Sequence, residues 1–220
     1  MLSFLKILET VQLEKLQNFY YNITTVNLKP KGPTMKEELN KCLNVLKKGG
    51  LILYPTDTIW GIGCDATNYD AVQKVFELKK RAESKALVCL VHDYKMLNQY
   101  IENIPEVAYD ILKYAQKPTT IIYDKAKLVA ENVVGEDESL AVRVAKDKFC
   151  NDLVKKFKRP LVSTSANISG KPSPKNFKEI SDEILKGVDY VVNLHQNKNM
   201  AKPSAIIKLG SDGMVKVLRK

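Results

Sequence analysis

Residues 51–90 read LILYPTDTIWGIGCDATNYDAVQKVFELKKRAESKALVCL, and this stretch decides how the chain folds. Its apolar start, residues 51–54, follows two glycines and predicts a short buried strand. The proline that comes next cannot donate a hydrogen bond to a sheet, so we expect the strand to end there. Thr56, Asp57 and Thr58 then place short polar side chains at a strand end, which is where open α/β sheets bind ligands.

A helix is predicted after this strand, from about Asn68 to Lys79. Asn68 is a favourable N-cap residue, and Val72, Val75 and Phe76 fall on one helical face. An apolar face of this kind predicts a helix that packs on the core.

Basic residues follow at the end of the helix, at Lys79, Lys80, Arg81 and Lys85. Side chains at positions i and i+2 of a helix point away from each other, so Lys79 and Arg81 converge only if the helix ends between them. In that case one cleft would combine hydroxyl groups from the strand end with cations from the helix end. Such a cleft suits a polyphosphate together with a small polar substrate.

A second cluster of hydroxyl groups lies at residues 163–174, STSANISGKPSP, after another short apolar run. A cluster of Ser, Thr, Asn, Gly and Pro is on its own usually only a loop. Two apolar runs that both end in hydroxyl groups favour a functional interpretation. The prolines on either side of Ser173 predict a rigid turn that holds this side chain in place.

Arg143 lies inside the apolar run at 139–144, which predicts a strand. Arginine is rarely buried without a partner, so a salt bridge and a ligand contact are both open for it.

Strands and helices alternate along most of the chain, which indicates an α/β or mixed α+β fold. Residues 1–28 carry leucines at helical spacing and predict a helical extension, which packs on the main domain or on another subunit.

Composition narrows the class of protein. The formal net charge is +10, from 35 Lys and Arg against 25 Asp and Glu, and it favours either an anionic partner or simply solubility. The four cysteines are widely spaced and predict reduced thiols in a cytoplasmic protein. With two histidines far apart we expect no metal site built from side chains, and no apolar run is long enough for a membrane span. The P-loop motif is absent, so a bound nucleotide needs a different cradle.

Four motifs, PTDTIWGIG, LKKR, SKAL and STSANISGKPSP, together resemble the YrdC-type family of threonylcarbamoyl-AMP synthases, over roughly Thr34 to the end of the chain. The resemblance implies a mixed α+β fold in which a twisted mixed β-sheet, flanked by helices, curves around an open, positively charged cavity. It also implies that residues 29–220 form a single YrdC-like catalytic domain, as in the short form of the family.

The activity implied by this resemblance joins L-threonine, bicarbonate and ATP to give threonylcarbamoyl-AMP and pyrophosphate, with Mg²⁺ accompanying the phosphates. The product would pass to later enzymes that make threonylcarbamoyladenosine in tRNA, and weak tRNA binding is an expected partner interaction. No membrane partner is expected.

The family motifs also imply roles for individual residues. The catalytic residues would be Lys79, Arg81 and Arg143. L-Threonine would contact Thr56, Thr58, Arg143 and Ser163. The nucleotide would contact Lys79, Arg81, Lys85, Ser139, Ser165, Asn167, Ser173 and Arg219. No carboxylate cluster in the sequence identifies magnesium ligands.

Two other functions stay open from the sequence. The basic charge is compatible with an RNA-binding module that uses the cavity without catalysis, although no basic stripe interleaved with aromatic residues is present. A domain that processes carbamoyl phosphate is the third hypothesis, because related folds perform that reaction. A requirement for threonine and bicarbonate distinguishes the synthase from both.

Overall fold

The computed structural model describes residues 15, 17, 32–81, 87–200 and 202–220. The chain divides into two compact units, Met1–Thr34 and Met35–Lys220. The predicted helical extension over residues 1–28 lies outside the described residues except for Lys15 and Gln17, and the predicted site residue Lys85 lies outside them as well. Everything that follows concerns the larger unit.

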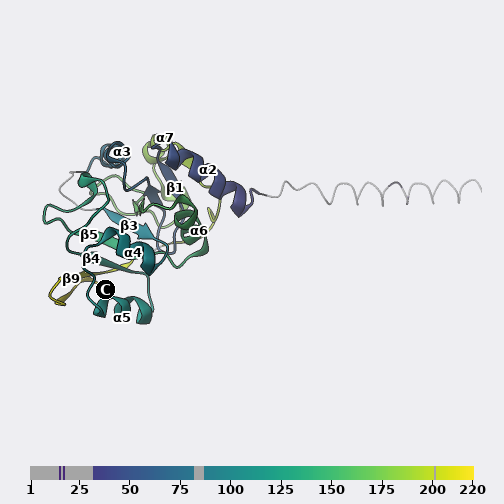
Figure 1. Ribbon diagram of the computed structural model, residues 1–220. Helices are drawn as coiled ribbons and strands as arrows, with labels where there is room; N and C mark the ends of the chain where they lie inside the picture. The colour runs from purple at the N-terminus through teal and green to yellow at the C-terminus, as the bar shows by residue number, and fades with distance from the viewer. Residues whose placement is uncertain (1–14, 16, 18–31, 82–86, 201) are drawn as a thin grey trace, which may run out of the picture. The chain divides into compact units, whose positions relative to one another are not determined.

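Two β-sheets form the centre of this unit (Figure 1). The four-stranded sheet has the order β7-β2-β1-β8, with β1 at Ile52–Tyr54, β2 at Gly61–Gly63, β7 at Thr164–Ser165 and β8 at Tyr190–Val191. The six-stranded sheet has the order β10-β9-β4-β5-β3-β6, with β3 at Val88–Val91, β4 at Thr119–Tyr123, β5 at Leu140–Val144, β6 at Leu161–Val162, β9 at Ala205–Leu209 and β10 at Val215–Arg219. Both sheets mix parallel and antiparallel pairs, so the predicted mixed α/β class is confirmed, with the strands divided between two sheets.

Helices flank the sheets (Figure 1). The α-helices are α2 at Met35–Lys47, α3 at Tyr69–Lys79, α4 at Tyr94–Tyr100, α5 at Val107–Tyr114, α6 at Lys148–Phe157 and α7 at Asp182–Gly187. Two short 3₁₀ helices, η1 at Glu131–Val133 and η2 at Phe177–Glu179, complete the set. None of the helices in the described part of the chain has the length and apolarity needed to cross a membrane.

Helix α3 has the bounds that the sequence predicts. The side chain of Asn68 caps its N-terminus by accepting a hydrogen bond from Ala71 N at 3.1 Å. The helix ends at Lys79, because Lys80 adopts the left-handed conformation with φ of 50°. Arg81 therefore leaves the helix in a new direction, and the end of α3 separates it from Lys79.

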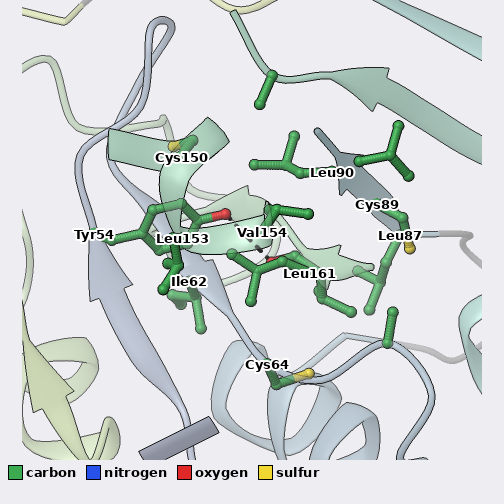
Figure 2. Close-up of a cluster of buried hydrophobic side chains, with 14 of the residues drawn as sticks. Tyr54, Ile62, Cys64, Leu87, Cys89, Leu90, Cys150, Leu153, Val154 and Leu161 are labelled. Carbon is green, nitrogen blue, oxygen red and sulfur yellow. Dashed lines mark hydrogen bonds between the residues drawn. The ribbon is translucent and has the colours of Figure 1, made fainter. Parts of the chain in front are cut away.

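The hydrophobic core lies where the two sheets approach each other. Figure 2 shows Tyr54 of β1 and Ile62 of β2 beside Leu153 of α6 and Leu161 of β6. The Tyr54 hydroxyl donates to the carbonyl oxygen of Val162 at 3.3 Å, which links β1 to the other sheet. Burial raises the pKa of this phenol well above its ordinary value, so it stays a neutral donor.

Gly63 makes this close approach possible. A Cβ atom at this position would lie 2.7 Å from the ring of Tyr54 and 2.7 Å from the carbonyl oxygen of Val162. Neither atom belongs to a flexible side-chain end, so only glycine fits between the sheets. Cys42, Cys64, Cys89 and Cys150 are all buried, and no disulfide joins any two of them.

The register of the six-stranded sheet decides which side chains share a face of the sheet with Arg143. Arg143 pairs with Leu90, Ala141 pairs with Val88, and alternate residues of a strand share one face. Val142 therefore points to the other face, where it is 2% exposed in the core.

Candidate active site

A cavity of about 330 Å³ lies between the two sheets, and polar side chains dominate its wall. Hydroxyl groups come from Thr56, Thr58, Ser163, Thr164, Ser165, Ser173 and Ser204. Guanidinium groups come from Arg81, Arg143 and Arg219. Among the described residues, no Asp or Glu side chain lines this cavity. The wall is therefore built to receive negatively charged groups.

Arg143 is the buried cation of the site. Strand β5 carries it, its side chain is 6% exposed, and Nη1 donates to the hydroxyl oxygen of Thr58 at 3.1 Å. Nη2 forms an ion pair with Asp57 Oδ1 at 3.3 Å. The buried Nε has no hydrogen-bond partner among the described residues. A buried donor without a partner is costly, so this guanidinium is suited to a carboxylate ligand.

The turn at residues 56–58 is held by its own side chains. Thr56 Oγ1 accepts from the backbone N–H groups of Thr58 at 3.0 Å and Ile59 at 3.2 Å, and it donates to the carbonyl oxygen of Ile59 at 2.7 Å. Either hydroxyl can donate in the 2.8 Å contact between Thr56 Oγ1 and Thr58 Oγ1, and the bond from Thr56 to the carbonyl oxygen of Ile59 favours Thr58 as the donor. Thr56 thus spends its hydrogen-bonding capacity inside the turn.

Ser163 stands where the chain passes from one sheet to the other. It separates β6, in the six-stranded sheet, from β7, in the four-stranded sheet, and its N–H donates to the carbonyl oxygen of Val88 at 2.7 Å. The side chain of Ser163 lies close to Gly61 of β2, since a Cβ atom added at Gly61 would lie 3.4 Å from Ser163 Oγ. The strands β2 and β7 were not predicted from the sequence, and their pairing is what brings Ser163 and Ser165 to the cavity.

Lys79 lies beneath the loop of the second hydroxyl cluster, outside the cavity lining. Its side chain is 2% exposed, and Nζ donates to the carbonyl oxygens of Ser165 at 2.5 Å and Asn167 at 2.6 Å. Burial, with a smaller effect of the neighbouring Arg81, lowers the pKa of this lysine to about 8. Lys79 therefore fixes the loop at 163–167 to the end of α3. The N–H of Ser169 also donates to the backbone carbonyl oxygen of Lys79 at 2.8 Å, which strengthens this link.

Several predicted site residues meet in the cavity and others do not. The residues that line it are Thr56, Thr58, Arg81, Arg143, Ser163, Ser165, Ser173 and Arg219. Ser139 lies outside the lining and donates to Asp137 Oδ1 at 2.5 Å. Asn167 also lies outside it, where its Nδ2 donates to the carbonyl oxygens of Ile168 at 3.0 Å and Lys171 at 2.6 Å.

Ser204 is a cavity residue for which the sequence analysis gave no role. It is 5% exposed, and its carbonyl oxygen accepts from Arg219 Nε at 2.8 Å. Its hydroxyl also contacts Thr120 Oγ1 at 2.8 Å, which ties the start of β9 to β4. The available signal was a polar residue between a proline and the apolar run of β9. Ser204 thus orients the guanidinium of Arg219 towards the cavity.

A second cavity, of about 960 Å³, shares a wall with the first. Thr56 and Thr58 line both cavities, whereas Asp57 and Asp147 line the second. Within the described part of the chain, no group of His, Cys, Asp and Glu side chains has an arrangement that would hold a metal ion.

The fold and the site define a mixed α/β protein whose two sheets enclose a polar cavity lined by arginine guanidiniums and hydroxyl groups. The chain belongs to the Sua5/YciO/YrdC family, which is described as "Telomere recombination" and matches residues 44–220.

Relatives of known name agree with this assignment. A protein of Methanocaldococcus jannaschii is 36% identical over 187 residues, which cover 83% of this chain and 87% of that protein. The threonylcarbamoyl-AMP synthase of Vibrio parahaemolyticus is 34% identical over 151 residues, which cover 67% of this chain and 82% of that enzyme.

Solved structures share the fold. The crystal structure of P. abyssi Sua5 complexed with L-threonine has a TM-score of 0.75 at 24% identity. The match covers 86% of this chain but only 55% of that one, so the present chain spans about half the length of that protein. The solution structure of MTH1692 from Methanobacterium thermoautotrophicum has a TM-score of 0.65 at 28% identity and covers 87% of this chain and 88% of that one.

Proposed function

We propose that this protein is an L-threonylcarbamoyladenylate synthase, which converts L-threonine, bicarbonate and ATP into threonylcarbamoyl-AMP, pyrophosphate and water. Membership of the family and the name of the V. parahaemolyticus relative support this reaction. The observation that carries the proposal is the cavity itself, where the buried Arg143 and several hydroxyl groups lie together with Arg81 and Arg219. An RNA-binding module without catalysis is not favoured by these similarities.

Threonine would bind at the wall formed by β5 and the turn at 56–58. The carboxylate of the amino acid suits Arg143, whose buried Nε has no partner among the described residues. Thr58 and Ser163 border the same space and would contact the rest of the substrate, while Thr56 keeps the turn in shape through its internal hydrogen bonds.

The nucleotide would bind at the remaining cations and hydroxyl groups. In the proposed reaction the amino nitrogen of threonine first bonds to the carbon of bicarbonate, and water leaves. An oxygen of the resulting carbamate then attacks the α-phosphorus of ATP, the bond from that phosphorus to the bridging oxygen breaks, and pyrophosphate leaves. Attacking group and phosphate are both anions, so the guanidiniums of Arg81 and Arg219 would reduce their repulsion and stabilise the transition state. Ser165 and Ser173 supply hydroxyl groups for the nucleotide in the same wall.

Two roles are proposed for Lys79, positioning of the loop at 163–167 and a direct contact with a phosphate, and they need different positions of Nζ. Its Nζ donates to two carbonyl oxygens of the loop at 163–167, so in this arrangement it acts by positioning Ser165. A direct contact with a phosphate would require Nζ to leave these carbonyl oxygens. The family resemblance also assigns Lys85, Ser139 and Asn167 to the nucleotide, and these assignments stay part of the proposal.

Magnesium is proposed to arrive with the nucleotide, since the described lining offers no carboxylate that would hold the ion alone. Bound to the phosphates it would neutralise charge on the leaving pyrophosphate. We further propose that the protein acts in the cytoplasm, that its product passes to later enzymes of tRNA threonylcarbamoylation, and that its own binding to tRNA is weak.

Pyrophosphate release tests this function. The purified protein is supplied with Mg²⁺ and ATP, and L-threonine and bicarbonate are omitted one at a time. The proposal expects release only when all substrates are present. Release that is indifferent to threonine would indicate another nucleotidyl transfer, and turnover of carbamoyl phosphate without bicarbonate would indicate the carbamoyl-phosphate reaction.

A further inference from the structure

Asp57 is the residue of the turn at 56–58 to which no role has been assigned. Its Oδ1 lies 3.3 Å from Arg143 Nη2, and the two side chains are 17% and 6% exposed. The residue as a whole is exposed because its backbone faces solvent, whereas the carboxylate is turned inward. An acidic side chain thus lies in contact with the guanidinium proposed to bind the carboxylate of threonine.

An α-amino acid presents a particular problem of charge. Its carboxylate and its ammonium group are attached to the same carbon atom, so the groups that bind them must be neighbours. Arg143 provides the cation, but among the described residues no carboxylate lines the first cavity. Asp57, which contacts Arg143, lines the second cavity, and its neighbours Thr56 and Thr58 line both cavities, so its carboxylate lies at the wall that the two cavities share.

The hydroxyl of Thr58 adds a second acceptor at this place. Either hydroxyl can donate in its 2.8 Å contact with Thr56, and donation by Thr58 is favoured because the proton of Thr56 is directed to the carbonyl oxygen of Ile59. The Thr58 oxygen accepts one hydrogen bond from Arg143 Nη1 at 3.1 Å, and a hydroxyl oxygen has two lone pairs. One lone pair therefore remains for a donor, and an ammonium group is a donor without acceptors.

The burial of Asp57 shows what a ligand must supply. Burial raises the pKa of this carboxylate, and the charge of Arg143 opposes that rise. A ligand with only a carboxylate would compete with Asp57 for the charge of Arg143 and leave Asp57 less well compensated, which is unfavourable in a partly buried site. A zwitterion brings an ammonium group to Asp57 while it brings a carboxylate to Arg143, so both buried charges keep a partner.

Resting on the proposed function, we propose that Asp57 binds the α-ammonium group of L-threonine, with the Thr58 oxygen as second acceptor, while Arg143 binds the carboxylate. Asp57 and Arg143 then form a pair that selects α-amino acids over plain hydroxy acids. Without substrate, Asp57 occupies the place of the substrate carboxylate at Arg143, and Arg143 occupies the place of the ammonium group at Asp57.

Calorimetric titration with two ligands tests this pair. The ligands are L-threonine and the 3-hydroxybutyrate that has the configuration of threonine at C3 but lacks the amino group. The wild-type protein is expected to bind threonine at least about tenfold more tightly, since a hydrogen bond to a charged group contributes about 1.5–3 kcal/mol. Equal binding of the two ligands by the wild-type protein would overturn the proposal without any variant.

The variant Asp57→Asn removes the negative charge at nearly constant volume. We expect it to weaken threonine binding by about 10- to 100-fold and to leave 3-hydroxybutyrate unchanged or bound more tightly. An equal loss for both ligands would show that Asp57 only positions Arg143, and an equal gain would show that it only competes with the substrate. Either result overturns the proposal.

Asp147→Asn is the matched control, because Asp147 lines the second cavity with Asp57 but makes no ion pair with Arg143 among the described residues. This variant should keep the wild-type ratio between the two ligands, and a collapse of the ratio in it would contradict a specific role for Asp57. A wild-type protein that binds no threonine would refute the proposed function itself, which is a different outcome from binding threonine with an unchanged ratio in Asp57→Asn.

Discussion

Two strand ends meet at the cavity, and they are held in different ways. The turn at 56–58 is fixed mainly by Thr56, whose hydroxyl bonds to groups no more than three residues away. The loop at 163–167 is fixed by distant partners, with Lys79 bound to two of its carbonyl oxygens and Ala166 N donating to Trp60 O at 3.0 Å. The first end is therefore a local structure, and the second depends on the packing of α3 and β2.

The largest expected effect comes from removing Arg143, which contacts Thr58 and Asp57 at the first strand end and is proposed to bind the carboxylate of threonine. Arg143→Ala should weaken threonine binding by about 4 kcal/mol, or roughly a thousandfold, because a buried charge pair loses one partner. Binding of ATP should change far less. Titration of each ligand into the variant measures this split, and Arg143→Lys should be intermediate because it keeps the charge but lacks the fork of donors. Unchanged threonine affinity in Arg143→Ala would show that Arg143 does not hold this substrate.

The second effect concerns Lys79 and the second strand end. Its pKa falls from the ordinary 10.5 to about 8 on folding. Between these values the unfolded chain holds a proton that the folded chain has released, so this group makes the free energy of unfolding rise with pH across the window. Two and a half pH units at about 1.4 kcal/mol each give a rise of at most about 3.5 kcal/mol.

Lys79→Met should lack this rise, which denaturant titrations at about pH 7.5 and about pH 10.5 measure against the wild-type protein. Lys95→Met, on an exposed face of α4, serves as control and should keep the rise. Hydrogen exchange should also accelerate at residues 163–167 in Lys79→Met and stay unchanged at 56–58. Normal exchange in the loop with a selective loss of ATP affinity would favour the phosphate contact instead.

Alanine substitutions at the two glycines of β2 should differ, since one should lower stability and the other should lower activity. Gly63→Ala should lower the free energy of unfolding by about 2 kcal/mol, because the added Cβ meets backbone and a buried ring. At Gly61 the added Cβ would have ordinary contacts of 3.4–3.5 Å, so stability should change by less than about 0.5 kcal/mol. Gly61 lines the cavity, however, and its variant should lose activity. Equal stability of the two variants, measured by denaturant titration, would mean that the sheets can separate to admit a methyl group.

The smallest effect tests the difference between the strand ends directly. Thr56→Val keeps the shape of the side chain but leaves the N–H groups of Thr58 and Ile59 without their acceptor, and should cost about 1.5 kcal/mol of stability. Thr164 is 9% exposed and its hydroxyl makes no hydrogen bond to other described residues, so Thr164→Val should cost less than about 0.5 kcal/mol. Thermal unfolding of both variants compares them. A reversed order would contradict the view that the first turn is held by its own side chains.

The same difference explains what the sequence could predict. The apolar run at 139–144 gave β5 with bounds close to those observed, and the cap at Asn68 gave the start of α3, because these signals are local. The strands β2 and β7 were missed because they consist of a few glycine, threonine and serine residues that are strands only through pairing with each other. The division of the strands between two sheets follows from the same pairs.

The candidate site shows the same limit. Thr58, Arg143 and Ser163 were identified from motifs and strand ends, and they meet in one cavity. The direction of Lys79 could not be read from its spacing to Arg81, because it depends on the left-handed residue that ends α3 and on a loop 86 residues away. The ion pair of Asp57 with Arg143 likewise joins residues that only the folded chain brings together.

We infer that threonine carbamate and ATP react in the first cavity, between the two sheets. Incubation with ¹³C-bicarbonate, L-threonine, ATP and Mg²⁺, followed by mass spectrometry, tests it most directly. We expect a threonylcarbamoyl adenylate that carries one ¹³C atom, formed by the wild-type protein and strongly reduced in Arg143→Ala. An adenylate without label, or labelled product formed equally well by Arg143→Ala, would contradict it.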